Sequence, residues 1–328
     1  MKRFWNWRSQ AWRGRAFQLL ALALLILLVW WLASNTAQNL KARGIQSGFD
    51  FLTQPAGFDI GESLLAFSST DTYWQAYVAG LLNTLRVALL GIVLATLVGL
   101  AVGVGRLGGN VLAKGLCTTY VELFRNVPLL LQLLLWYLLF TEVLPAADQA
   151  WQLGPVFLSK GGLSYPWLDF QSGAAVWSFP HQGEFAIEGG AALTPEFMAL
   201  VLGLSLYTAA FAAEVIRAGL EAVPRGQSEA AAVLGLSRSQ TLRLVQLPLA
   251  LRVIIPPMTN QYLNLTKNSS LAVAIGYPDV VSIANTSINQ TGRALECISL
   301  IMAVYLLLSL TTSALMGLYN RRAALVER

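Results

Sequence analysis

Four ionisable side chains lie inside apolar stretches of this sequence, where they could do chemistry. Glu122 and Arg125 stand about one helical turn apart, whereas Glu214 and Lys267 lie in two later stretches. A charged group inside a membrane helix is costly, so it usually faces a bundle interior or a pathway for a polar solute. These residues are therefore candidates for a polar pathway. The alternatives are a structural pair between Glu122 and Arg125, and a scaffold role for the other two.

The sequence offers little for an enzyme. His181 is the single histidine, and no Gly-x-x-x-x-Gly-Lys-Ser/Thr phosphate loop occurs, so nucleotide binding of that kind is not expected. The two cysteines, Cys117 and Cys297, are predicted near opposite membrane faces, which would keep them unpaired as small apolar packing residues. We therefore expect no catalytic residue, no metal site and no cofactor in this chain.

The composition indicates lipid as the main solvent of the chain. Of its 328 residues, 55% are hydrophobic and only 12% are charged, with a mean hydropathy of +0.57. An ordinary soluble domain carries about 25% charged residues. The net charge is +5, but the basic residues flank the apolar runs instead of clustering on one face. We therefore expect a lipid membrane and no nucleic acid as the surroundings of this chain.

Six apolar stretches are long enough for the roughly 20 residues that a membrane-spanning helix needs. The first resembles a secretory signal, but its length and the pair Trp30-Trp31 near its far end favour an uncleaved anchor. The fourth follows Thr194-Pro195-Glu196, a typical helix start. The predicted spans are 17–34, 81–105, 116–143 with Pro128 inside it, 197–219, 250–276 and 298–318.

The placement of Lys and Arg predicts the orientation of these spans. With a cytoplasmic N-terminus, the segments outside the cell membrane hold few basic residues, and these are Lys41, Arg43, Lys160 and Arg293. This asymmetry fits the positive-inside rule and returns the C-terminus to the cytoplasm. Two long segments, about 35–79 and 144–195, then lie outside. The second is predicted to be an ordered irregular cap, with a simple connector as the alternative.

The stretch after the fourth span carries the most specific pattern. Glu229-Ala230-Ala231 is followed by three residues and Gly235, then by nine residues and Val245-Gln246-Leu247-Pro248. Ser228 is a suitable helix N-cap, and the alanines favour a helix with a thin surface that another protein can approach. Gly235 permits a sharp turn with positive φ, and Pro248 is expected at the start of the next membrane helix. A docking helix is predicted, with a plain surface helix as the alternative.

This pattern resembles the Glu-Ala-Ala loop of ABC importer permeases, in which the triplet, the glycine and Ile-x-Leu-Pro have the same spacings. Val245 in place of Ile is the one departure. The further resemblance, over about 78–320, is to the polar amino-acid family, although Asn126 and Asn268 differ from its commonest residues. The matching residues are Tyr207, Glu214, Arg217, Gly219, 222–227, 247–252, Pro256-Pro257, 267–271 and 121–130.

The resemblance implies an all-α membrane protein with about six spans and a type I ABC importer permease core. It divides the chain into an N-terminal segment 1–77, the core 78–320 and a tail 321–328, with a periplasmic insert at 144–195 and a cytoplasmic coupling loop at 220–248. It also implies a place in the bacterial inner membrane and an ATPase docked on the coupling loop. The residues implied for coupling are Gln227, Ser228, Glu229, Ala230, Ala231, Gly235, Leu247 and Pro248.

The same resemblance implies the partners. ATP and Mg²⁺ would bind to separate ATPase subunits, a periplasmic binding protein would deliver an amino acid, and a second, related but non-identical permease would complete the membrane part. Because an amino acid is a zwitterion, Glu214 is a candidate for its ammonium group, and Arg125 or Lys267 for its carboxylate. The candidate pathway residues are Glu214, Lys267, Asn264, Ser269, Ser270, Arg125 and Glu122.

Two features of the spans predict their neighbours. The fifth span is unusually polar, which favours a stripe facing a partner subunit or an aqueous passage over exposure to lipid; its polar residues are Asn260, Asn264, Thr266, Asn268, Ser269 and Ser270. Gly99 and Gly103 have the spacing of close helix packing.

Three rival functions would each require different features of the sequence. A secondary transporter should show inverted repeats with broken helices at matched positions, which this sequence lacks. A membrane enzyme would need clustered His, Cys or carboxylates. A scaffold subunit beside a sister chain that holds the substrate stays open.

Overall fold

The computed structural model of the chain describes residues 10–44, 47–169, 175–183 and 186–323. Positions 1–9 of the predicted N-terminal segment and 324–328 of the predicted tail lie outside the described residues. The described part is mostly helical. Its long helices are α1 (Gln10–Ala42), α2 (Tyr73–Gly105), α5 (Pro195–Glu221), α8 (Leu247–Asn268) and α10 (Ala294–Ala323).

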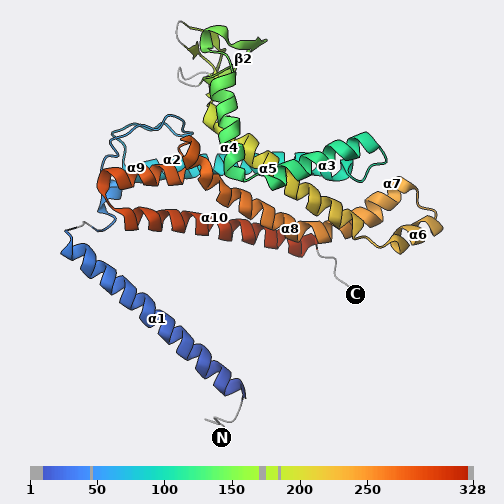
Figure 1. Cartoon of the computed structure of the whole chain (residues 1–328), viewed down its shortest axis with the longest axis horizontal. Helices are drawn as coiled ribbons and strands as arrows, with labels where there is room; N and C mark the ends of the chain where they lie inside the picture. Colours follow the sequence, from blue (N-terminus) through green and yellow to red (C-terminus); the bar gives the residue numbers. More distant parts are fainter. Residues whose placement is uncertain (1–9, 45–46, 170–174, 184–185, 324–328) are drawn as a thin grey trace.

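Helices α2, α5, α8 and α10 form the bundle, and α1 stands apart from it (Figure 1). Five segments of the described chain are long and apolar enough to cross a membrane, and a bent pair of helices could supply a sixth. The prediction of about six spans is therefore confirmed. Thr194 caps α5 as predicted, because its hydroxyl accepts a hydrogen bond from the Phe197 amide at 3.1 Å and Pro195 follows at the first turn.

The predicted third span is not one continuous helix. The chain bends by 104° between α3 (Val111–Asn126) and the segment formed by α4 (Leu129–Leu138) and π-helical η2 (Leu139–Val143). The reason is Pro128, which has no N–H to donate and drives Val127 out of the helical region to φ −95° and ψ 129°. The buried Gln132 amide steadies the bend by donating to the carbonyls of Phe124 at 2.9 Å and Val127 at 2.8 Å.

The insert contains β structure, which corrects both the irregular cap and the all-α prediction at this place. After η3 (Ala147–Gln149) a sheet of order β1-β2-β3-β8 forms, all pairs antiparallel, with two small hairpins, β4-β5 and β6-β7. Strands of two to four residues are too short to reveal an alternating pattern in sequence. They are Trp151–Leu153, Val156–Ser159, Gly162–Tyr165, Trp167–Asp169, Val176–Ser178, His181–Gln182, Ile187–Glu188 and Ala191–Leu193.

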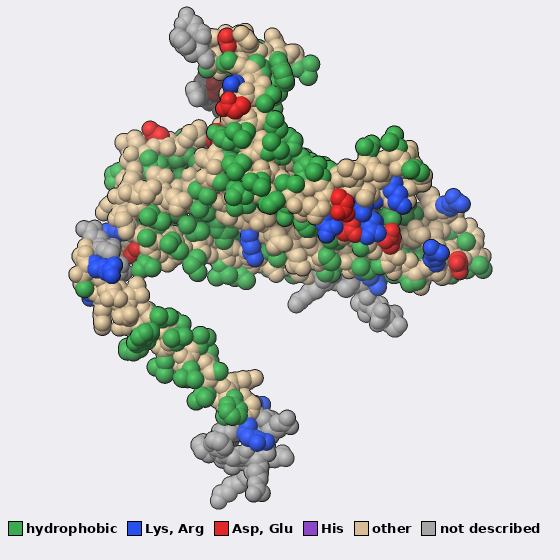
Figure 2. All heavy atoms as spheres, in the orientation of Figure 1, with side chains coloured by type: hydrophobic (Ala, Val, Ile, Leu, Met, Phe, Trp, Pro, Cys, Tyr) green, Lys and Arg blue, Asp and Glu red, His purple; other side chains and the backbone are tan. Residues whose placement is uncertain are grey.

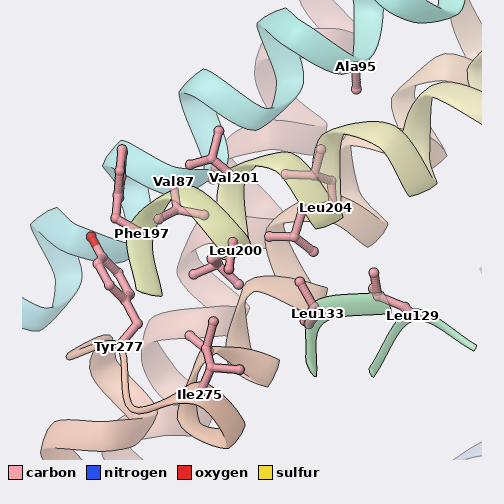
Figure 3. Close-up of a cluster of buried hydrophobic side chains, with 14 of the residues drawn as sticks. Val87, Ala95, Leu129, Leu133, Phe197, Leu200, Val201, Leu204, Ile275 and Tyr277 are labelled. Atoms are coloured by element: carbon pink, nitrogen blue, oxygen red, sulfur yellow. The ribbon is translucent and has the colours of Figure 1, made fainter. Parts of the chain in front are cut away.

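The bundle core forms where α2 and α5 meet α4 and the 3-10 helix η5 (Ser269–Ile275) (Figure 3). Leu133, Leu200 and Leu204 are fully buried there. Helices α2 and α5 approach closely, since an added Cβ would lie 2.7 Å from the Ala212 Cβ at Gly99 and 2.8 Å from the Ala213 carbonyl oxygen at Gly103. The predicted packing role of the glycines is thus confirmed.

A segment that we call the N-terminal strap, residues 48–72, lies across the end of the bundle opposite α6 and α7 (Figure 1). It includes the 3-10 helix η1 (Asp50–Thr53) and packs near α9 (Val280–Thr291). Phe51, a residue of the strap itself, is fully buried. The strap therefore belongs to the folded body.

Ion pairs fasten the strap at two places. The Glu62 carboxylate accepts from Arg86 of α2 at 2.6 Å and also from the Thr194 hydroxyl at the start of α5. The Asp50 carboxylate accepts from Arg293, whose Nη2 lies 3.0 Å from Oδ2. The strap thus joins the N-terminal ends of α2, α5 and α10.

Candidate coupling site and polar pathway

A helix lies where one was predicted after the fourth span, as α6 (Arg225–Val233). The structure corrects its start. Pro224, with φ −59° and ψ 135°, occupies the N-cap position, so Ser228 lies inside the helix instead of capping it. Proline cannot continue α5, and its fixed φ suits the beginning of a new helix, which therefore starts four residues earlier than a Ser228 cap would place it.

Gly235 ends α6 with a left-handed turn, as predicted. Its φ is +77°. The Leu236 amide donates to the Ala231 carbonyl at 3.1 Å and the Gly235 amide to Ala232 at 3.0 Å, which is the paired hydrogen bonding of a Schellman motif. This conformation is unfavourable for a residue with a Cβ. The local backbone conformation therefore explains why glycine stands at this position.

The two faces of α6 differ in burial. Ala231 is 3% exposed and faces the rest of the loop, whereas Glu229 and Ala230 are exposed. At the end of the helix, Val233 is 88% exposed and Leu234 is 81% exposed. Two adjacent apolar side chains held out on a rigid turn form a surface suited to a protein partner. We call Glu229, Ala230, Val233 and Leu234 the docking face.

The loop returns to the bundle as one long helical segment. Ser237 and Gln240 form a capping box at the start of α7 (Arg238–Thr241), followed by π-helical η4 (Leu242–Gln246) and α8. Pro248 lies in the first turn of α8, as predicted. The wider π turn before it gives the proline ring room beside the preceding carbonyls, so the segment continues without a break.

A side-chain hydrogen bond joins the two arms of the loop. Nε2 of Gln246 donates to Oγ of Ser228 at 2.8 Å across 18 residues of sequence. Ser228 was expected to contribute to coupling as a cap, and its actual contact is with the helix that leads into α8. Gln246 was not among the predicted site residues because it stands at the variable position of the Ile-x-Leu-Pro pattern.

Glu214 lies in a charged cluster at the end of α5 that leads into the loop. Its carboxylate accepts from Arg106, at the C-terminal end of α2, and from Arg217 one turn further along α5. Arg217 also donates to Glu221 at 2.5 Å. Two guanidinium groups thus satisfy the carboxylate, and Arg106 was absent from the predicted site residues.

The polar residues of α8 and η5 separate into two sets. The hydroxyls of Ser269 and Ser270 donate to carbonyls three residues earlier in their own helix, at 2.7 and 2.8 Å. By contrast, Asn260, Asn264 and Lys267 are exposed, and their spacing places them on one helix face. A polar stripe that this chain leaves uncovered needs an aqueous or protein neighbour in a membrane.

Glu122 and Arg125 take separate partners. Glu122 accepts a long hydrogen bond of 3.4 Å from the Asn126 amide, and the Arg125 guanidinium lies 5.2 Å from the Phe211 ring centroid. The ion pairs found among the described residues do not include these two with each other. The structure does not gather the seven candidate pathway residues into one pocket of this chain.

Charged and apolar side chains are unevenly distributed over the visible surface. Figure 2 shows a group of charged side chains toward the end that carries α6 and α7, further charges on the β insert and at the opposite end of the bundle, and hydrophobic side chains spread over the bundle. This distribution is that of a membrane helix bundle with polar ends.

The comparisons with known proteins agree with this geometry. Residues 89–325 match the family model of the binding-protein-dependent transport system inner membrane component. The chain belongs to this family. It is therefore a subunit of an ABC transport system and a multi-pass inner-membrane protein, which confirms the predicted class and the prediction of a transporter subunit rather than an enzyme. Such a system works with an ATPase and a binding protein.

Relatives match this family member along nearly its whole length. The general L-amino acid transport system permease protein AapQ of Rhizobium johnstonii is 42% identical, covering 99% of this chain and 96% of the relative. The glutamate/glutamine/aspartate/asparagine transport system permease protein BztB of Rhodobacter capsulatus is 36% identical, covering 96% of this chain and 95% of the relative. A crystal structure of an amino acid ABC transporter with histidines matches with a TM-score of 0.55 at 28% identity, over 76% of this chain and 95% of that chain.

Proposed function

We propose that this permease moves L-amino acids into the cytoplasm and that its ATPase subunit docks on α6. The observation that carries the docking site is the exposed apolar end of α6, Val233 and Leu234, held out by the Gly235 turn. A membrane subunit needs a surface for its ATPase, and two exposed apolar side chains on a short rigid helix can fill a partner's cleft. ATP and Mg²⁺ then bind in the ATPase, and this chain needs no cofactor of its own.

The amino-acid substrate is supported by the relatives. AapQ is named for general L-amino acids and BztB for glutamate, aspartate and their amides, and both align with nearly all of this chain. Both names describe amino acids with different side chains, so the shared chemistry is the zwitterionic backbone.

The pathway lies beside the polar stripe of α8. Asn260, Asn264 and Lys267 face away from their own bundle, so a second permease of the same family, related but not identical, covers them and closes a polar passage between the two chains. Lys267 is placed to attract the substrate carboxylate. Glu214, already bound by two arginines, holds α2 against α5 in this arrangement.

The proposed topology follows from the same assignment. With α6 and α7 in the cytoplasm, the strap and the β insert at 144–195 lie in the periplasm, where the binding protein arrives. Both chain termini are then cytoplasmic. The segments 1–77, 78–320 and 321–328 act as anchor and strap, permease core and tail.

Co-purification tests the docking site. We expect the tagged chain, extracted gently from its host membrane, to bring down an ATPase, a second permease and a binding protein. Val233→Asp should lose the ATPase, because a charge replaces an apolar contact. Val176→Asp is a matched control, since that valine is also exposed, at 54%, on the β insert. ATPase retained by Val233→Asp, or lost equally from both variants, would contradict docking on α6.

Uptake into proteoliposomes tests the substrate. The complete complex should import labelled L-amino acids with acidic, amide and aliphatic side chains when ATP is present inside. Lys267→Gln should raise the KM for uptake, because one donor to the carboxylate is lost. Uptake of no amino acid by a complex that hydrolyses ATP would contradict the proposed substrate.

A further inference from the structure

The loop has two arms: the segment from α5 that leads into α6, and the return arm from α7 and η4 that leads into α8. Helix α6 is anchored to the return arm more firmly than to α5. Three residues, 222–224, separate it from α5, and Pro224 interrupts the helix there. Within the described residues α6 packs on α7 and η4 instead, and Ala231 is its one buried residue. A push on α6 therefore reaches the return arm of the loop directly, whereas the route to α5 runs through a non-helical link.

The return arm is mechanically continuous. Helix α7, the π turn η4, α8 and η5 form one uninterrupted segment, Arg238–Ile275, without a bend large enough to divide it. That segment carries Gln246 near one end and the polar stripe with Asn264 and Lys267 further along. A displacement at Gln246 therefore has one continuous helical segment, which includes Pro256 and Pro257, leading toward the stripe.

Side-chain packing between α6 and this arm is incomplete. A cleft of about 420 Å³ lies between them, lined by residues of both arms, among them Ala232, Leu236 and Thr241. The Ser228–Gln246 hydrogen bond bridges this cleft at 2.8 Å. A directional bond across an open cleft fixes the separation and angle of two elements that packing leaves loose.

We propose that the Ser228–Gln246 hydrogen bond is a strut that passes movement of α6 to α8. The inference rests on ATPase docking at α6, proposed above. Neither residue belongs to the docking face, and neither stands at a fixed position of the Glu-Ala-Ala pattern. Ser228 and Gln246 are positioning residues: they do not touch the ATPase or the substrate, and they make α6 and α8 move as one body.

The test uses the complete complex of this chain with its second permease, ATPase and binding protein, reconstituted in proteoliposomes. Ser228→Ala and Gln246→Leu each remove the bond. We expect the ATPase to co-purify as with the unaltered chain and to keep its basal hydrolysis. Uptake of amino acid per ATP hydrolysed should fall about fivefold or more, within the usual range of coupling between two sites. The double variant should be no worse than either single variant.

Two matched variants separate a strut from general loosening of the loop. Ser228→Thr keeps the hydroxyl and should restore coupling. Ser239→Ala removes an exposed hydroxyl from α7 and should leave coupling unchanged. Unaltered uptake per ATP in Ser228→Ala, additive losses in the double variant, or no rescue by Ser228→Thr would each overturn the strut.

ATPase binding distinguishes the proposed strut from the proposed docking of the ATPase on α6, on which the strut rests. Loss of the ATPase from Ser228→Ala would overturn the strut and leave α6 as the docking site, because the bond would then shape the docking face. Absence of the ATPase from the unaltered complex would overturn docking on α6 and the strut with it.

Discussion

At the scale of one residue, Gly235 connects backbone conformation to the proposed docking face. Its φ of +77° is needed for the two hydrogen bonds that end α6 and hold Val233 and Leu234 outward. An added Cβ would meet nothing within 4 Å, so crowding is not the reason for a glycine here. The reason is the left-handed conformation itself, which costs an L residue about 1 to 2 kcal/mol.

Gly235→Ala should therefore weaken ATPase binding by loosening the end of α6. Gly235→Asn should be milder, because asparagine tolerates the left-handed region better than alanine. Hydrogen exchange of residues 231–236 and the amount of co-purified ATPase would measure both effects. Equal behaviour of the two variants would show that the turn conformation does not set the docking face.

Glu214 is a single charge that two arginines satisfy in this fold. Replacing it by Gln removes the charge from two hydrogen bonds to arginine, each worth about 1.5 to 3 kcal/mol in general. Glu214→Gln should lower the melting temperature of the detergent-extracted chain and leave the KM for amino acids unchanged. A raised KM with an unchanged melting temperature would return Glu214 to the substrate pathway.

At the scale of elements, the contact of α2 with α5 depends on close approach of backbones. A Cβ at Gly103 would lie 2.8 Å from the Ala213 carbonyl oxygen and 3.2 Å from Ile216. Small residues allow such approach between membrane helices, where packing rather than burial from water drives association.

Gly103→Val should separate α2 from α5 and destabilise the bundle by about 1 to 3 kcal/mol, the usual range for overpacking. Gly115→Val, on the open side of α3, is the control, since nothing lies within 4 Å of a Cβ there. Thermal unfolding of the detergent-extracted chain would compare them. If Gly115→Val lowered the stability as much as Gly103→Val, the effect would come from placing valine in a helix and not from the packing of α2 on α5.

At the scale of the whole molecule, the N-terminal strap joins parts of the chain that are far apart in sequence. Asp50 and Arg293 are separated by 243 residues, and their ion pair ties the strap to the start of α10. The guanidinium of Arg293 lowers the pKa of the Asp50 carboxyl below its usual value of 3.8. A lowered pKa means that the pair stabilises the fold above about pH 4 and ceases to do so as the pH falls through the lowered value.

Asp50→Asn should consequently make the strap easier to cleave with protease at pH 7. The difference from the unaltered chain should shrink as the pH falls below about 4, because the carboxyl is then protonated first in the unfolded form and, below its lowered pKa, in the folded form as well. An acid-stable protease applied between pH 7 and 3 would follow this. A difference that stays constant over that range would mean that the charge of Asp50 does not hold the strap.

Local features were predictable from sequence. The apolar runs, the Thr194 cap of α5 and the Gly235 turn depend on residues near one another in the chain, so their physical causes can be read there. The prediction that Ser228 caps α6 was wrong because Pro224, four residues earlier, forces the helix to begin sooner. The third predicted span is bent by 104° and is not one helix, because Pro128 breaks the helix that it was expected to lie within.

The sequence by itself determined a membrane helix bundle with a helix and a tight turn in the loop after α5, because hydrophobic length, helix caps and the backbone limits of glycine and proline act over a few residues. Only the tertiary structure decided the partners of the polar groups. Glu214 meets Arg106 across 108 residues, and Ser228 meets Gln246 across a turn and a π helix. Charges and hydrogen bonds are satisfied by whichever groups the fold brings near, and distance along the chain does not reveal that proximity.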